Sequence, residues 1–135
     1  MTKTRLGAPV VGIAALLLLA GCSGTGFSVL DTEQTEEDQL PAIMVDSLEL
    51  DDYDLASSRF SASYEGVDMY LLTDKDLGMP CLAVSGEGEL DNVIVCGGNG
   101  EVETSVGGFD VQLVREPAVE ADGWTVISDN LRVRD

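Results

Sequence analysis

The chain of 135 residues contains 25 acidic residues, seven basic residues and no histidine, and its formal net charge at pH 7 is −18. A nucleic-acid partner needs clustered Lys and Arg to neutralise phosphates, so this composition argues against nucleic-acid binding. The lack of histidine excludes every mechanism that uses an imidazole as base, metal ligand or proton shuttle.

The first 21 residues have the pattern of an export signal. Lys3 and Arg5 precede an apolar segment, Val10 to Ala20, which ends in small residues. A helix that spans the bilayer needs about 20 apolar residues, and this segment is shorter. The sequence therefore predicts a signal-peptide helix over 1–21 and a mature chain that begins at Cys22.

The four residues Leu19-Ala20-Gly21-Cys22 resemble the lipobox of bacterial lipoproteins. The resemblance implies a covalent diacylglyceryl group on Cys22, no other cofactor, and a lipid-anchored position on the outer face of the plasma membrane. Two acyl chains suit this role because a single chain binds a membrane only marginally. The alternative is an ordinary signal peptide that is cut near Ala20.

Residues 22–40 are predicted to form the lipidated cysteine and a flexible acidic tether. Loss of residues 1–21 leaves five basic residues against 25 acidic ones, a mature net charge of −20. The segment is rich in Gly, Ser, Thr, Gln and acid, so it buries too little apolar surface to offset the entropy of ordering. Leu40-Pro41 marks the boundary of an extracytoplasmic domain over 41–135.

The start of this domain is predicted to hold a short strand over 42–45, a loop over 46–58 with at most one helical turn, and then a hairpin. A two-residue turn at Glu65-Gly66 aligns three apolar pairs on one face, with Tyr70 on the opposite, polar face. The expected pairs are Tyr64 with Val67, Ala62 with Met69, and Phe60 with Leu71.

A second hairpin brings two cysteines together. With Gly88-Glu89 as a type II′ turn, Val84 lies opposite Val93, Ala83 opposite Ile94, Leu82 opposite Val95, and Cys81 opposite Cys96. Opposed residues of an antiparallel pair are close enough for a disulfide. The sequence therefore predicts the Cys81–Cys96 bond, with a reactive thiol pair as the alternative.

Further alternating segments predict two more hairpins. Residues 102–106 and 109–113 flank Gly107-Gly108, and residues 124–127 precede a last strand over 131–133. About seven short strands with no helix indicate a mainly β domain, a small antiparallel sandwich or partial barrel built from hairpins.

A second resemblance concerns most of the mature chain. The motifs are Leu40-Pro41, Ser57-Ser58-Arg59, Tyr70-Leu71, Cys81-Leu82, Cys96-Gly97 and Ser128-Asp129-Asn130-Leu131. Their order is similar to that of small actinobacterial lipoproteins of uncharacterised function. The resemblance implies no catalytic residues.

Metal and enzyme sites have weak sequence support. Asp51, Asp52, Asp54, Asp74 and Asp76 are candidate calcium ligands, but their spacing is not that of an EF-hand, and a solvated acidic surface is the favoured interpretation. The chain has no Gly-x-Ser-x-Gly motif and no phosphate-binding loop. Paired carboxylates for hydrolysis stay open because abundant acids always permit a pair.

Four aromatic residues and one arginine are the remaining candidates for functional residues. Trp124, Tyr53, Tyr64 and Tyr70 are considered as a ligand platform. The favoured interpretation places Trp124 and Tyr64 in the core and the other two half-exposed on strands. Arg59 is interpreted as a structural counter-ion in an acidic region.

These patterns together predict a non-enzymatic, lipid-anchored module that contacts envelope proteins outside the plasma membrane. A lipoprotein that binds a cation or small ligand is the alternative function, and a carboxylate-dependent hydrolase is the second alternative.

Overall fold

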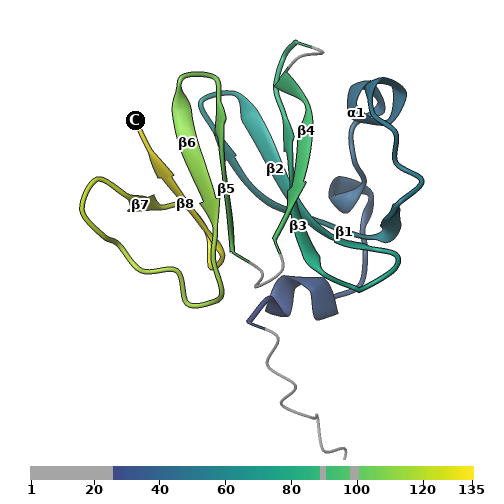
Figure 1. Cartoon of the computed structure of the whole chain (residues 1–135), viewed down its shortest axis with the longest axis horizontal. Coiled ribbons are helices and arrows are strands. Elements are labelled where there is room, and N and C mark those ends of the chain that lie inside the picture. The colour runs from purple at the N-terminus through teal and green to yellow at the C-terminus, as the bar shows by residue number, and fades with distance from the viewer. Residues whose placement is uncertain (1–25, 89–90, 98–100) are drawn as a thin grey trace, which may run out of the picture.

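Two antiparallel sheets form the body of the protein. The computed structural model describes residues 26–88, 91–97 and 101–135, and within them each sheet has four strands, in the orders β1-β2-β3-β4 and β5-β6-β8-β7 (Figure 1). The two sheets pack through a shared apolar core. The prediction of a mainly β antiparallel sandwich is confirmed.

The strands of the first sheet are β1 (Tyr53–Tyr64), β2 (Val67–Asp74), β3 (Pro80–Ser85) and β4 (Val93–Cys96). Those of the second are β5 (Val102–Val106), β6 (Phe109–Leu113), β7 (Thr125–Val126) and β8 (Leu131–Arg134). Three short helical segments precede them: η1 (Ser28–Asp31), η2 (Glu36–Asp38) and α1 (Ala42–Ser47).

The helix α1 replaces the strand that was expected over 42–45, so that prediction and the expected absence of helix are wrong. Leu40, Met44 and Leu48 recur every four residues and pack into one apolar cluster on the outer face of the first sheet. Met44 lies within α1, and Leu40 and Leu48 flank its two ends and pack on the same side. Pro41 stands at its N-cap, where the missing N–H of proline is tolerated.

Both faces of β2 are buried. Val67, Met69 and Leu71 belong to the core between the sheets, while Tyr70 and Leu72 belong to the outer cluster that Met44 of α1 covers. The expectation that Tyr70 lies on a polar face is therefore wrong, because only 5% of this residue is exposed. Burial is the main cause that raises the pKa of its hydroxyl, and Asp68 and Asp38 add to the increase.

The first hairpin departs from the predicted register at one residue. Tyr64 lies opposite Val67 and Ala62 opposite Met69, as expected, but Phe60 pairs with Tyr70 and not with Leu71. The register shift between Phe60 and Ala62 leaves Ser61 as the extra residue of a β-bulge. The shift sets the rings of Phe60 and Tyr70 edge to face at 5.6 Å.

The second hairpin has the predicted register throughout. Four residue pairs from Val84–Val93 to Cys81–Cys96 match, and the disulfide joins Cys81 to Cys96. Of the turn that was expected at Gly88-Glu89, Glu89 lies outside the described residues. The hairpins β5–β6 and β7–β8 also form as predicted.

Residues 26–40 belong to the folded body, so the prediction of a flexible tether is wrong for this part of the segment. Phe27 is only 1% exposed and packs in the core between the sheets, with Val29 and Leu30 beside it. A few apolar side chains in a polar segment supply burial that the average composition does not indicate.

We expect the disulfide to supply about 3 kcal/mol of the unfolding free energy, because a closed loop of about 15 residues restricts the unfolded chain by that amount. Chemical denaturation should show this loss in the Cys81→Ala/Cys96→Ala variant and equally in the reduced wild type. An unfolding free energy that reduction leaves unchanged would contradict the prediction.

Candidate functional site

A groove follows α1 along the outer face of the first sheet, and we call it the α1 groove. It consists of three adjoining hollows of about 290, 520 and 170 Å³. Val45 and Leu55 line both of the first two hollows, and Leu48 and Tyr53 line both of the last two. These shared residues make the hollows direct neighbours, and we describe them together as one groove.

The walls of the groove present aliphatic side chains to solvent. Val45 of α1 is 44% exposed and Leu55 of β1 is 39% exposed, and Ile43 of α1 is also exposed. A six-residue helix turns one side toward its support, here through Met44, and leaves its other residues outside. The exposed aliphatic residues are thus a consequence of how α1 is attached.

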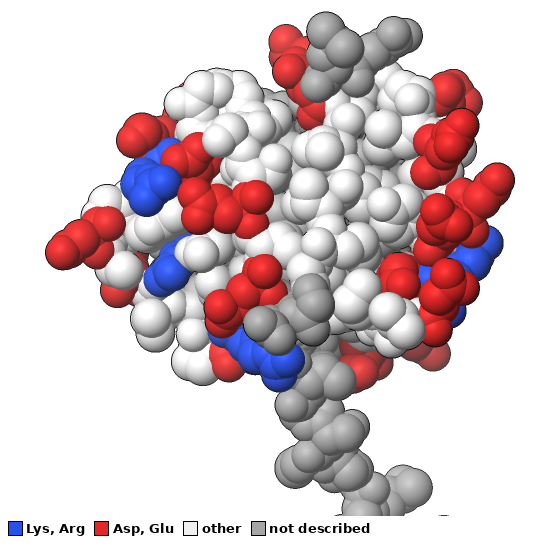
Figure 2. Space-filling model, viewed as in Figure 1, with Lys and Arg blue, Asp and Glu red and all other residues white. Residues whose placement is uncertain are grey.

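Acidic side chains surround these aliphatic walls. Glu49 and Asp51 border the 520 Å³ hollow together with Lys75. Asp46 follows Val45 on α1, Asp54 precedes Leu55 on β1, and both are exposed. Figure 2 shows acidic side chains along the edge of the molecule where Figure 1 places α1. The groove therefore combines aliphatic walls with a mainly acidic rim.

The N-terminal segment holds the β1 side of the groove in place. Between Asp54 and Arg59, β1 leaves its register with β2. Gln34 donates from Nε2 to the carbonyl oxygens of Leu55 and Ser58, at 2.9 and 3.2 Å. The Ser58 hydroxyl donates to the carbonyl of Asp38 at 2.7 Å. These contacts fix the irregular stretch that carries Leu55.

Asp38 is a second point of attachment between this segment and β1. Its carboxylate accepts hydrogen bonds from the Thr35 N–H at 2.8 Å, the Thr35 hydroxyl at 3.0 Å and the Phe60 N–H at 2.9 Å. Burial acts to raise the pKa of Asp38, but these hydrogen bonds and the positive charge of Arg59 outweigh it, so the pKa lies below its usual value.

Arg59 is the third attachment, and it is only 7% exposed. Its guanidinium donates to the carbonyl oxygens of Thr32, Ala56 and Ser58. Arg59 was predicted to be a structural counter-ion. Its positive charge does lower the pKa of Asp38, but its described hydrogen bonds go to main-chain carbonyl oxygens and not to a carboxylate. These three carbonyl oxygens accept hydrogen bonds from the buried guanidinium, which would be costly to leave without partners.

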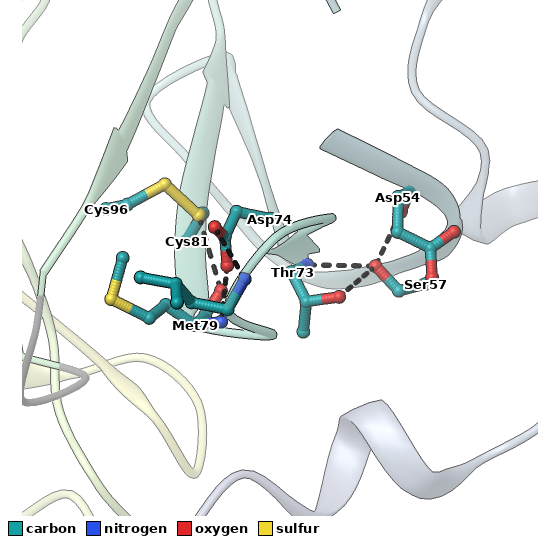
Figure 3. Close-up of a disulfide and its surroundings, with 8 residues drawn as sticks. Asp54, Ser57, Thr73, Asp74, Met79, Cys81 and Cys96 are labelled. Carbon is teal, nitrogen blue, oxygen red and sulfur yellow. Dashed lines mark hydrogen bonds between the residues drawn. A yellow bond between two sulfur atoms is a disulfide. The ribbon is translucent and has the colours of Figure 1, made fainter. Parts of the chain in front are cut away.

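The predicted calcium ligands are not brought together. Among the residues that the structure describes, no group of three or more Asp, Glu, Cys or His side chains could hold a metal ion. Asp74 accepts hydrogen bonds from the N–H groups of Leu77 and Met79 in its own turn, near the disulfide. Figure 3 shows Asp54 on the far side of Thr73, and its carboxylate accepts from the Ala56 N–H.

The four aromatic residues that were considered as a platform lie at separate places. Trp124 stacks under Arg132 and Arg134, whose guanidinium carbons are 5.4 and 4.4 Å from the ring centre. It is half-buried outside the core, so its predicted core position is wrong. Tyr64 is half-buried and contacts Phe109 of the core at 4.9 Å, Tyr70 is buried, and Tyr53 borders the α1 groove.

Sequence reasoning missed the aliphatic residues of the groove. The spacing of Leu40, Met44 and Leu48 was the available signal, because it predicts a helix that turns Ile43 and Val45 away from the sheet. The predicted lipidation residue, Cys22, and the signal segment lie outside the described residues.

Comparison of the chain with protein-family models, with curated proteins and with solved structures found no match. In the described part of the chain, no helix has both the length and the apolar character that crossing a membrane requires.

We expect the attachment through Asp38 to weaken in acid. A carboxylate with a lowered pKa in the folded state stabilises the fold above its unfolded pKa, and this contribution disappears as the pH falls through the folded pKa. The difference in unfolding free energy between wild type and Asp38→Asn should therefore be full at neutral pH and shrink as the pH falls below the unfolded Asp pKa of about 3.9. Glu37→Gln, a change at the exposed neighbour, is the control, and a difference that does not depend on pH would refute this role.

Proposed function

We propose that this protein is a lipid-anchored, non-enzymatic binding module on the outer face of the plasma membrane, of the kind that small actinobacterial lipoproteins represent. The anchor is supported by the lipobox-like residues that end at Cys22. The binding role is supported by one observation above all, the solvent-open α1 groove with its aliphatic walls and mainly acidic rim.

The partner that fits this groove is a protein segment with an aliphatic or aromatic side chain flanked by Lys or Arg. Apolar side chains gain about 25 cal/mol per Å² when they leave water, so Val45 and Leu55 supply the attraction. The acidic rim then selects basic flanks and speeds encounter. An anionic membrane or a second copy of this acidic chain would be repelled by the same charges.

The cation-binding alternative has less support. A calcium site needs six to eight oxygen ligands that converge on one point. The acidic residues of the described chain are instead dispersed, and Asp74 and Asp54 accept hydrogen bonds from their own turns.

The anchor predicts a definite result for Cys22→Ala. Wild-type protein expressed with its leader should be recovered in the membrane fraction and carry the mass of a diacylglyceryl group. The variant lacks the thiol that receives this group, so it should appear in the soluble fraction without the added mass. Equal recovery of both proteins with membranes would refute the anchor.

The groove predicts different results for two matched changes, Val45→Asp and Val119→Asp. Both replace an exposed valine by a charge, but Val119 lies outside the groove at 60% exposure. We expect Val45→Asp to weaken binding of a fluorescent amphipathic Leu/Lys peptide about tenfold, since one buried valine is worth about 1.5 kcal/mol. Fluorescence anisotropy measures the change.

The added negative charge makes this test decisive. If charge alone attracted the peptide, both variants would bind it more tightly than wild type. Equal affinity in the two variants would therefore overturn the groove as the binding site. A Leu/Glu peptide of the same pattern should not bind, and thermal unfolding shows whether each variant is folded.

A further inference from the structure

The chain is fixed to the domain from its first described residue. The carbonyl oxygen of Gly26 accepts hydrogen bonds from the Glu116 N–H and from Nδ2 of Asn130, both at 2.8 Å. Asn130 is itself buried, at 2% exposure. Gly26 has a φ of +79°, and a Cβ there would lie 2.9 Å from Cβ of Arg115, so this position requires glycine.

The two residues that follow strengthen this attachment. Phe27 is buried in the core between the sheets. Ser28 donates from its N–H and its hydroxyl to the carboxylate of Glu116, at 2.8 and 2.7 Å. No freely jointed segment therefore remains between Gly26 and the body of the domain.

The chain between Cys22 and Gly26 is too short to hold the domain away from a membrane. Four peptide steps extend to at most about 14 Å, at no more than about 3.6 Å each. A lipid on Cys22 would therefore hold Gly26 within about that distance of the headgroups. The predicted tether of about 18 residues would have allowed about 25 Å and free rotation.

This short connection selects one end of the sandwich, which we call the proximal end. It contains η1, the turn over 75–79 between β2 and β3, and Arg115. Phe27, Leu30, Gly78 and Arg115 line one hollow of about 490 Å³, so these parts are neighbours. In Figure 1 the first described residues and η1 lie at this end, and the turns at Glu65-Gly66 and Gly107-Gly108 lie at the opposite, distal end.

The chemistry of the proximal end suits a headgroup layer. Leu77, at the tip of the 75–79 turn, is 73% exposed, more than any other large hydrophobic residue in the described chain. The charges at this end are mixed: Arg115 and Asp31 line the same hollow, and Lys75, which also borders the α1 groove, lies between Asp74 and Asp76. The exposed apolar side chain of Leu77, held close to the membrane by the short connection, is therefore what suits this end to the headgroup layer.

We propose that the proximal end rests on the lipid surface to which Cys22 is anchored, with Leu77 in the headgroup layer. The distal hairpin turns then point away from the membrane, and the α1 groove lies on the flank, open to partners. This orientation depends on the lipid anchor of the proposed function, and it adds a second lipid contact that the anchor alone does not require.

The orientation is tested with lipidated mature protein in vesicles of phosphatidylcholine and phosphatidylglycerol that carry a nitroxide on the headgroup of a minor lipid. A fluorophore is attached through Leu77→Cys in one sample and through Ser63→Cys, an exposed residue beside the distal turn, in the other. The disulfide keeps Cys81 and Cys96 from reacting with the label. We expect at least about twofold stronger quenching at position 77, because the seven residue steps of β2 separate the two ends by about 23 Å.

A matched variant carries about 20 Gly and Ser residues inserted between Thr25 and Gly26, which restores a flexible reach of about 25 Å. Its quenching at position 77 should fall to that at position 63. Equal quenching at both positions in the unmodified protein, with the protein still floating with vesicles, would overturn the orientation and leave the anchor standing. Protein of the native sequence that does not float with vesicles would overturn both.

Discussion

The burial of β2 on both faces is the constraint on which the rest of this structure depends. Its inner side chains join the two sheets, and its outer ones, Tyr70 and Leu72, require a cover that α1 provides through Met44. A short helix is not stable alone, so α1 exists because this apolar surface must be covered. The groove beside α1 follows from the same need, since so small a cover leaves Val45 and Ile43 in solvent.

The N-terminal segment has a comparable double role. Phe27 anchors it to the core, and Gln34, Asp38 and Arg59 join it to the irregular part of β1 that carries Leu55. The contacts of Gln34 and Asp38 satisfy main-chain groups of β1 in or beside the stretch where its pairing with β2 is interrupted. One segment thus shapes a wall of the groove and determines where the chain leaves the domain, so the proposed binding surface and the proposed orientation on the membrane have a common structural origin.

The strong negative charge of the chain agrees with both the proposed binding surface and the proposed orientation. Acidic residues around the α1 groove favour a basic partner and oppose contact between this flank and anionic lipids. The proximal end differs because it contains the exposed Leu77 and is where the short connection to Cys22 begins. If only the proximal end contacts the lipid, the distal end and the flank with the α1 groove stay available for partners.

The sequence by itself determined the hairpins, because alternation, turn residues and cysteine spacing act between residues that are near in the chain. The match of Cys81 with Cys96 and the β5–β6 and β7–β8 pairs are local in this sense. Only the tertiary structure decided the bulge at Ser61, the burial of Tyr70 and Phe27, and the helix α1. Each of these depends on an apolar surface supplied by a distant segment, which outweighs local composition. The groove belongs to the second group, since its walls come from α1 and β1, whose relative position is set by packing on β2.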